Sequence, residues 1–337
     1  MTNIVESSFA GAIKTKFEPR LLMSALAKLV HGRWGVKATL NQYGVNEWRR
    51  YSALSAITSA LTEATTPTEQ TAPTLTQVTA TPLHYGSWIG YSDEMLAKSF
   101  DPVVSWVAGV LGRQAGLSVD TLRRNEITDG ATKLYSNSKA SRAVLDAPDD
   151  NLNFKDILRA IATLQANDAE GASSGRYPVI AHPDSWATLM MDPTFNNLFV
   201  HGSPATDQNP LRSGFVGTLL NCDFYVTSNA REYADGGAGD TDAYSLVFIG
   251  NESYGIAGIQ GMFASEVDAS GPGYSNNTGA GQEISPVKLI LKSPGSAGAD
   301  DPLDQRGSVG WKLAEDSEIL NILFLVDLEH TTIRSDE

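Results

Sequence analysis

Hydrophobic residues recur at helical spacing in several parts of the chain. Phe17 to Val30 carries Pro19 in its first turn and places its leucines on one stripe, which predicts a short helix. A longer pattern begins at Asp101-Pro102, a good N-cap followed by proline, and ends at Asp129-Gly130. At 1.5 Å per residue this helix is a rod of roughly 40 Å. Because it lacks heptad charges, we expect it to pack along a sheet as a scaffold rather than form a coiled coil.

The other patterns are shorter and mix helix with strand. Asn153 to Asp168 predicts a helix with Asn153 and Asp156 in capping positions, and His182-Pro183 opens another helix that reaches Met191. Strand-like runs are Trp34 to Leu40, Asn46 to Tyr51, Leu83 to Tyr91, Arg176 to Ala181, Asp223 to Thr227, Tyr244 to Ile249, Tyr254 to Ile259, Pro286 to Lys292, Val309 to Leu313 and Glu318 to Leu328. Helices and strands interleave without a regular βαβ series, so we predict the α+β class.

Ser52 to Thr81 departs from both patterns. Its thirty residues hold ten threonines, no lysine or arginine, and two acids, Glu63 and Glu69. So few apolar residues cannot bury enough surface to order the segment alone. Threonine and valine nevertheless favour extended backbone. The segment therefore predicts a long extended arm that lies on another surface, and a neighbouring copy of the same protein is the natural candidate.

Composition narrows the class of protein. With 337 residues, the chain exceeds the size of one ordinary core, so two domains or a body with long extensions are expected. The net charge of −14 argues against a protein that coats nucleic acid by neutralising phosphates. The first ten residues do not resemble a signal peptide, and no apolar run approaches the length of a membrane span. The single cysteine, Cys222, excludes an internal disulfide and suits a reducing compartment.

Candidate catalytic and ligand-binding groups are scattered. Gly171 to Gly175 matches the pattern of a nucleophile elbow, but a helix precedes it and a strand follows, which reverses the required context. The glycine-rich stretches do not follow a phosphate-loop pattern. The histidines, at positions 31, 84, 182, 201 and 330, show no metal-helix spacing. Two acidic runs, at Asp235, Asp240 and Asp242 and at Asp300, Asp301 and Asp304, lack calcium-loop spacing. We therefore predict no enzyme, catalytic residue, cofactor or metal site.

Two pairs of arginines remain. The simple interpretation of Arg49-Arg50 and of Arg123-Arg124 is surface charge. Because the first pair adjoins the arm, pairing with acids of a neighbouring subunit is the alternative there. The second pair lies near the end of the long helix, where arginine also complements the helix dipole.

The order of these parts resembles tailed-phage major capsid proteins of the Hong Kong 97-like fold, and the local residues resemble the branch typified by the N-four-like phages. The most specific run is Asp301-Pro302-Leu303-Asp304-Gln305-Arg306-Gly307-Ser308-Val309-Gly310-Trp311-Lys312, followed by Ile319-Leu320-Asn321. Weaker matches are Leu21-Leu22, Leu61-Thr62-Glu63 followed by Pro67, and Tyr85-Gly86. The resemblance covers nearly the whole chain.

This resemblance implies a division into parts. Residues 1–45 would be an N-arm, and residues 46–92 an extended loop, the E-loop, which in this fold reaches over an adjacent subunit. Residues 93–150 would form the spine helix and peripheral domain, and residues 151–290 mainly the axial domain. Residues 291–337 would be C-terminal strands that return to the peripheral and axial sheets. Because the first predicted helix begins by Phe17, a separate scaffolding protein, or none, is expected.

The resemblance also implies a function: self-assembly into pentamers and hexamers of an icosahedral shell around double-stranded phage DNA. Portal and scaffolding proteins would be partners, and a decoration protein is possible. The chain would be made in the bacterial cytoplasm and reside in the virion capsid, with no sequence-specific DNA binding and no membrane. An encapsulin-like nanocompartment shell of the same fold is the alternative. A tail or fibre protein fits the long helix and mixed order poorly.

Overall fold

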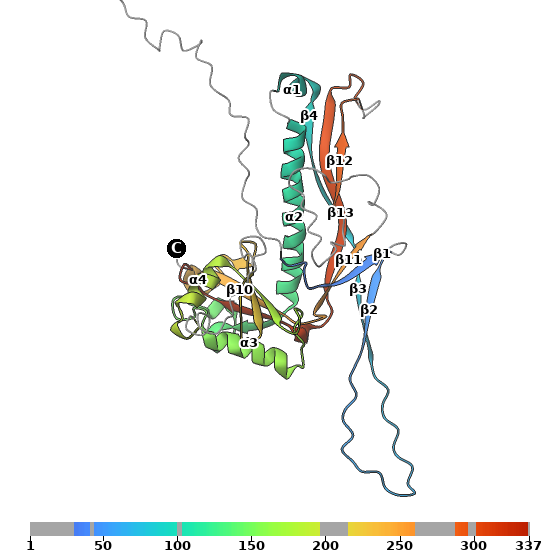
Figure 1. Ribbon diagram of the computed structural model, residues 1–337, viewed down its shortest axis with the longest axis vertical. Coiled ribbons are helices and arrows are strands. Elements are labelled where there is room, and N and C mark those ends of the chain that lie inside the picture. Colours follow the sequence, from blue (N-terminus) through green and yellow to red (C-terminus); the bar gives the residue numbers. More distant parts are fainter. Residues whose placement is uncertain are drawn as a thin grey trace, which may run out of the picture.

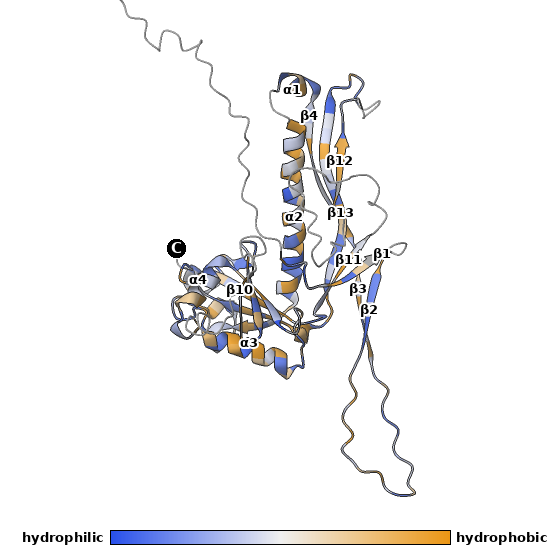
Figure 2. Cartoon of the chain, in the orientation of Figure 1, coloured by the Kyte–Doolittle hydropathy of each residue, from blue (hydrophilic) through white to orange (hydrophobic). Residues whose placement is uncertain are grey.

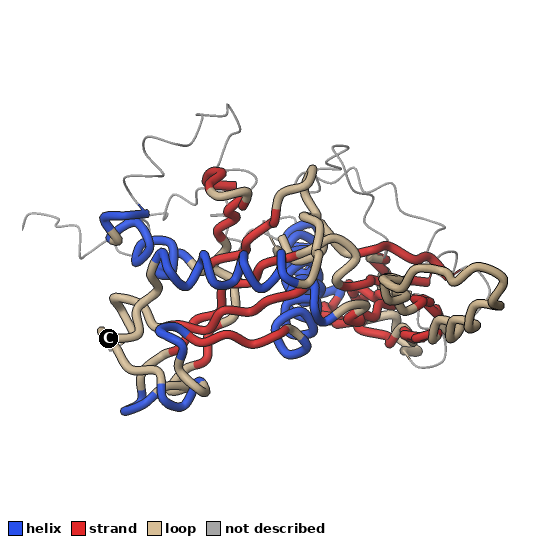
Figure 3. Tube along the Cα trace, turned by 90° about the horizontal axis from the view of Figure 1, so that it is seen from below, coloured by secondary structure: helices blue, strands red, loops and turns tan. Residues whose placement is uncertain are grey.

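The computed structural model describes residues 30–40, 44–99, 103–195, 215–259, 287–295 and 301–335. It contains an elongated unit, a compact unit and a protruding ribbon (Figure 1). The elongated unit is a five-stranded sheet backed by the long helix α2, Val103–Gly130. Seen along that helix, the compact unit lies to one side and the long sheet to the other (Figure 3).

The sheet of the elongated unit is built around one long strand, β13, Arg306–Ile319. β4, Leu83–Ser92, pairs with it antiparallel over ten residues, from Arg306↔Ser92 to Glu315↔Leu83. β12, Lys288–Lys292, and β11, Tyr254–Ile259, pair antiparallel with successive stretches of β13, and β1, Val36–Leu40, adds a parallel edge to β11. A short helix, α1, Asp93–Lys98, follows β4 and is capped by the Ser92 hydroxyl. β13 therefore ties distant parts of the chain into one sheet.

The compact unit is a seven-stranded mixed sheet. Its order is β5-β14-β10-β6-β8-β7, with β9 paired to β10. The strands are β5 Thr132–Tyr135, β6 Tyr177–Ala181, β7 Phe215–Leu219, β8 Cys222–Val226, β9 Glu232–Tyr233, β10 Ala243–Ile249 and β14 Leu325–His330. Helices α3, Phe154–Ala166, and α4, Pro183–Met191, pack on this sheet through a common cluster of buried side chains. A second cluster, which includes Ile127 of α2 and Val247 of β10, joins the compact unit to the elongated one.

The ribbon consists of β2, Asn46–Tyr51, and β3, Leu75–Ala80, paired antiparallel from Asn46↔Ala80 to Tyr51↔Leu75. Residues 52–74 continue beyond it as an extended loop (Figure 1). From here on, the arm means residues 46–80, which add β2 to the extended segment predicted from the sequence. A sequence low in apolar residues thus forms a pair of strands only where it leaves the body.

Most sequence predictions agree with these elements, and the main error lies near the C-terminus. The predicted strand Glu318 to Leu328 is wrong, because β13 extends to Ile319 and a 3₁₀ turn at Ile322–Phe324 separates it from β14. The Asn321 side chain accepts a hydrogen bond from the Leu323 amide and stabilises this turn. The sequence also missed α1, β5, β7 and β9. The predicted helix at Phe17 to Val30 and the cap at Asp101-Pro102 lie outside the described residues, apart from Val30.

Candidate assembly surfaces

The arm is the most exposed part of the described chain. Every residue from 51 to 77 is exposed, and Ile57 and Leu61 show 77% and 78% of their surface to solvent. Ser52 holds the end of the ribbon, since its amide donates to the Thr74 carbonyl at 2.9 Å and its hydroxyl accepts from the Thr74 amide. Beyond that point the loop extends away from the described part of the body (Figure 1). Side chains of this kind gain burial only from another molecule.

The base of the arm is fixed firmly to the elongated sheet. The Thr81 amide donates to the Asp316 carboxylate at 2.7 Å, just beyond the end of β3. At the other limb, the Trp48 ring lies so close to Gly255 of β11 that a Cβ there would come within 2.6 Å of it. The direction of the arm is therefore set by the body, although its tip is not covered by it.

Arg49 belongs to a small polar group on the arm itself. Its Nε lies 2.5 Å from Glu47 Oε1, and Gln77 Nε2 donates to the same oxygen at 2.7 Å. Arg50, the next residue, is exposed. Pairing of these arginines with acids of a neighbour stays a prediction, in which Glu47 competes for Arg49.

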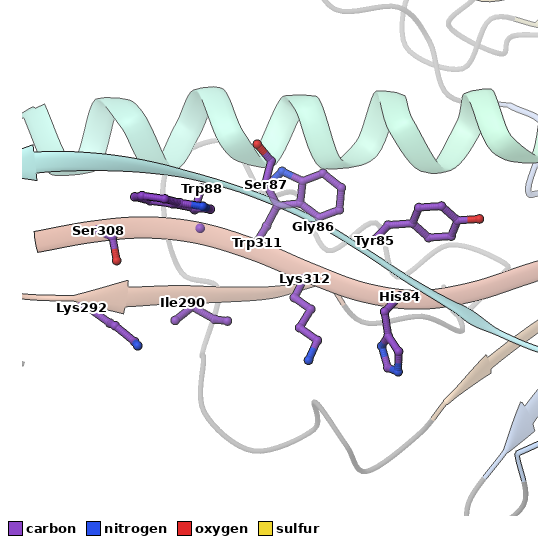
Figure 4. Close-up of a pocket in the computed structure, with 11 residues that line it drawn as sticks. His84, Tyr85, Gly86, Ser87, Trp88, Ile290, Lys292, Ser308, Trp311 and Lys312 are labelled. Atoms are coloured by element: carbon purple, nitrogen blue, oxygen red, sulfur yellow. The ribbon is translucent and has the colours of Figure 1, made fainter. Parts of the chain in front are cut away.

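A second exposed surface is the face of the elongated sheet turned away from α2. An open hollow of about 560 Å³ lies there between β4, β12 and β13 (Figure 4). Lys292, Lys312 and His84 point away from the helix at this site (Figure 4). Trp88 is 71% exposed, and it faces Gly310 across the strand pair, where a Cβ would come within 2.9 Å of the Trp88 Cβ. Glycine at this position makes room for a large aromatic side chain that the subunit leaves uncovered.

The opposite face of the same sheet is dry and well packed. Val309, Trp311 and Leu313 of β13 are buried against Leu111 and Ala115 of α2. The Trp311 indole also donates to Gln114 Oε1 at 3.1 Å. The expectation that the long helix packs along a sheet is confirmed. The two faces of the sheet therefore differ: one is buried against α2, and the other leaves the Trp88 side chain exposed.

Asp120, on α2, joins three separate parts of the chain. Its Oδ1 accepts from the amides of Val30 and His31 at 3.0 and 2.9 Å, and its Oδ2 lies 2.8 Å from His31 Nδ1. Asn229 Nδ2, from the loop after β8, donates to the same Oδ2 at 2.7 Å. These hydrogen bonds favour the ionised form and outweigh the effect of burial, so the pKa of Asp120 is lowered. Sequence reasoning missed this residue.

The second arginine pair does not form a surface patch. Arg123 is buried and binds Glu315 of β13 through two contacts, Nε–Oε1 at 2.5 Å and Nη2–Oε2 at 2.8 Å. Arg124 reaches the carbonyl and side chain of Asn229 at 3.2 Å. The interpretation of Arg123 as surface charge is therefore wrong. Both arginines connect α2 to neighbouring elements of the same subunit.

The compact unit buries two carboxylates on β14. Asp327 and Glu329 have no exposed surface, and Lys133 Nζ lies 2.6 Å from the first and 2.9 Å from the second. Arg142 binds Glu329 through two contacts at 2.6 and 2.7 Å and lies over the Tyr233 ring. Burial raises the pKa of Asp327 to about 6, whereas the hydrogen bonds to Arg142 and Lys133 hold the pKa of Glu329 below its usual value. This network is paired within the subunit, as buried charges require.

The structure brings together two of the candidate histidines, since the centroid of the His182 ring lies 5.0 Å from that of Tyr244, the cross-strand partner of His330. Ser173 sits in the loop between α3 and β6, where its hydroxyl contacts Asp223 at 3.1 Å. His182 caps α4 and His330 is buried against Ser185, while His201 and Asp300 lie outside the described residues. Burial raises the pKa of the Cys222 thiol to about 12.

The acidic loops are also dispersed. The Asp235 amide donates to Asp242 at 2.9 Å, and Asp301 accepts from the Arg306 amide at 2.6 Å, so both runs stabilise turns. Within the described ranges, no three His, Cys, Asp or Glu side chains gather in a way that could hold a metal ion. No helix there is long and apolar enough to cross a membrane.

Comparison with known proteins gives a consistent result. Residues 74–316 match a protein family described as "Phage capsid protein". No curated protein matches the chain. The structure is similar to the capsid of Ralstonia phage GP4, with a TM-score of 0.70, 12% identity and all of both chains covered.

Two cyanophage capsids are similar as well. For cyanophage P-SCSP1u the TM-score is 0.67 at 12% identity, with 97% of this chain and 96% of that chain covered. For cyanophage Pam1 the TM-score is 0.67 at 10% identity, with 99% of each chain covered. At such low identities the likeness is one of fold, and it extends over the whole length of each protein.

Proposed function

Because the chain belongs to the phage capsid protein family, a family of structural proteins that assemble with themselves into virion shells, we propose that it is the major capsid protein of its phage. It assembles into pentamers and hexamers of an icosahedral shell that encloses double-stranded DNA. The observation that carries this proposal is the arm, whose 27 consecutive exposed residues from 51 to 77 need a neighbour for burial. The family match also favours a phage shell over a nanocompartment.

In this proposal the fold is Hong Kong 97-like, and the parts of the chain take the following roles. Residues 1–45 are the N-arm, 46–92 the E-loop, 93–150 the spine helix and peripheral domain, 151–290 mainly the axial domain, and 291–337 the returning C-terminal strands. The long α2 against the five-stranded sheet supports the peripheral assignment, and the separate compact unit supports the axial one. The run from Asp301 to Lys312 supports the N-four-like branch.

The proposed contacts are of modest strength and many in number, as a closed shell requires. The apolar side chains of the arm lie on an adjacent subunit, and the Trp88 face of the sheet is a surface that assembly would cover. The net charge of −14 lets the shell hold DNA by confinement without adhering to it. Portal and scaffolding proteins are the proposed partners, with a decoration protein as a further candidate, and the particle is built in the bacterial cytoplasm.

A deletion of the arm tip tests the role of the arm. Residues 54–72 are replaced by a two-residue Asn-Gly turn, which keeps β2 and β3 paired up to Ser52 and Thr74. We expect an unchanged far-ultraviolet circular dichroism spectrum and thermal midpoint, together with loss of closed shells in electron micrographs. Thr68→Ser, which keeps the arm intact, serves as the control. Normal shells from the deletion variant would show that the arm is not the clasp between subunits.

A further inference from the structure

Two arginines, Arg124 and Arg231, lie together where α2 meets the compact unit, and we call them the arginine pair. Arg124 Nη2 donates to Asn125 Oδ1 at 2.9 Å, and Arg231 Nη1, from the loop between β8 and β9, donates to the same oxygen at 2.5 Å. Figure 2 shows hydrophilic residues on this part of α2. Two guanidinium groups thus share one neutral acceptor, and no carboxylate of the described residues contacts either of them.

The positive charge of the arginine pair is only partly balanced inside the subunit. Burial and the neighbouring Arg231 lower the pKa of Arg124, and they outweigh the attraction of Asp120. Asp120 is itself bound to His31 and Asn229. Arg231 Nε is buried and has no hydrogen-bond partner among the described residues, which is costly for a buried donor. The pair therefore retains both charge and donors for a carboxylate from outside the subunit.

Three carboxylates without a cation lie on the opposite side of α2. This acidic group consists of Glu126 on α2 and Asp316 and Glu318 on β13. Burial and the nearby carboxylates of β13 raise the pKa of Glu126, and burial and Asp316 raise that of Glu318. No cation of the described residues forms an ion pair with any of the three. Successive residues of an α-helix are about 100° apart, so Glu126 and Arg124 point in directions about 200° apart.

Opposite charges on opposite sides of one helix suit a head-to-tail contact between identical subunits. In such a contact the acidic side of one copy meets the basic side of the next, and the series closes into a ring where the rotation allows it. Complementary charges steer the encounter and disfavour wrong partners and registers. Subunits with a net charge of −14 repel one another in general, so a local basic site directs where they meet.

We propose that the arginine pair of one subunit binds the acidic group of a neighbouring copy. This contact rests on the proposed function and deepens it, because it names a surface through which subunits join side by side. Guanidinium groups bind carboxylates through paired hydrogen bonds, which fix orientation as well as contribute affinity. The contact involves α2 and the elements on either side of it, and it is separate from the tip of the arm.

Charge reversal in the full-length protein tests this contact. Arg231→Glu and Glu318→Lys each bring like charges together across it, so each should raise the critical concentration for assembly by at least about tenfold. Combining the two substitutions in one chain restores an opposite-charge pair and should recover most of the loss. Assembly is followed by sedimentation velocity and electron micrographs. Lys155→Glu, at an exposed position on α3, changes the net charge by the same amount as Arg231→Glu and is the control.

Neutral variants keep the test usable if a reversal prevents folding, which circular dichroism would reveal. Arg231→Gln and Glu318→Gln should each raise the critical concentration by a smaller, several-fold amount. The second substitution should add little when the first is already present, because the pair is then already broken. Fully additive effects of the two neutral variants would show that these residues do not meet across a contact.

The possible results separate this contact from the proposed function. If the unmodified protein assembles and both reversals assemble as well as Lys155→Glu does, the contact is wrong and the proposed function stands. A double reversal that assembles no better than the worse single reversal would also overturn the contact, since the two groups would then serve different partners. If the unmodified protein stays monomeric at every concentration, the proposed function fails and this contact fails with it.

Discussion

The arm and the compact unit obtain their order in opposite ways. All six residues of β14 and all seven of β10 are buried, so the compact unit is stabilised by its own core. In the arm, every residue from 51 to 77 is exposed, so the apolar side chains of this stretch bury little surface against the described part of the subunit. Substitutions in the compact unit should therefore alter folding, and substitutions in the arm should alter assembly.

The charged residues of the two regions differ in the same way, being buried in the compact unit and exposed in the arm. The compact unit buries Asp327 and Glu329 completely and pairs both with Lys133. The arm keeps Arg49 and Glu47 in contact with solvent, where ion pairs contribute little to folding. Substituting one of these charged residues should therefore affect folding in the compact unit and recognition of a neighbouring subunit in the arm.

The largest contrast is expected from truncation of one apolar side chain in each region. Phe224 is buried against Trp186 and Phe195, with ring centroids at 5.6 and 5.8 Å. Phe224→Ala should lower the free energy of unfolding of the isolated subunit by about 3–5 kcal/mol, because a cavity remains. Leu61→Ala should leave unfolding in urea unchanged but raise the concentration needed for assembly. Equal effects of the two variants on urea unfolding would contradict the comparison.

Glu315→Gln tests the buried ion pair of the elongated unit. The substitution leaves Arg123, which is 10% exposed in its side chain, without its carboxylate. We expect the free energy of unfolding to fall by about 3 kcal/mol, since removing one partner of a buried ion pair is costly. Glu47→Gln, in the exposed pair on the arm, is the matched control and should not change it. Both values come from urea denaturation followed by tryptophan fluorescence. A stable Glu315→Gln protein would mean that water reaches Arg123.

The pH dependence of folding should arise in the compact unit. Burial lowers the pKa of His330 from 6.5 to about 4, and its ring nitrogens contact the Leu328 carbonyl and the Ser185 hydroxyl. The unfolded chain takes up this proton near pH 6.5 and the folded chain only near pH 4. Between these values the unfolded state binds more protons, so acid should reduce stability, by at most about 3 kcal/mol from this group.

Asp327 acts in the opposite direction, because its raised pKa lets the folded state bind a proton first. To separate the two groups, the pH dependence of the free energy of unfolding is compared between the unmodified protein and a His330 variant. The stability advantage of the unmodified protein over His330→Gln should shrink as the pH falls from 6.5 to 4. His84→Gln, the same substitution at an exposed position of the elongated unit, is the control. A difference that stays constant with pH would show that His330 is already protonated, or hydrated, in the folded subunit.

Elements that depend on local sequence patterns could be predicted from the sequence. α2, α3 and β2 follow from local patterns, and Asn153 caps α3 as expected by accepting from the Asp156 amide at 3.2 Å. The arm was found because its composition alone excludes a core. The break between β13 and β14 was missed because the run from Ile319 to Val326 is apolar, although Asn321 was a turn signal within it.

Residues that act through distant partners could not be predicted. Asp120 contacts residues about ninety positions before it and more than one hundred after it, and Arg123 contacts a residue 192 positions away. Nothing in the local sequence marks these pairs. The close approach of Trp88 to Gly310 could not be predicted either, because the two residues lie in strands far apart along the chain.

The smallest expected effect comes from the arginines of the arm. Arg49 is 61% exposed and already bound to Glu47, so Arg49→Ala with Arg50→Ala should not change the unfolding of the isolated subunit. If these cations meet acids of a neighbouring subunit, the variant should assemble at a higher critical concentration, measured by light scattering. The deficit should narrow as salt is raised, because exposed pairs are screened. Lys98→Ala, which removes an exposed cation paired to Glu94 on α1, is the control. Glu47 competes for Arg49, so the opposite outcome is also informative. If assembly is unchanged at every salt concentration, Arg49 only stabilises the ribbon. The arm would then recognise a neighbouring subunit through its apolar residues.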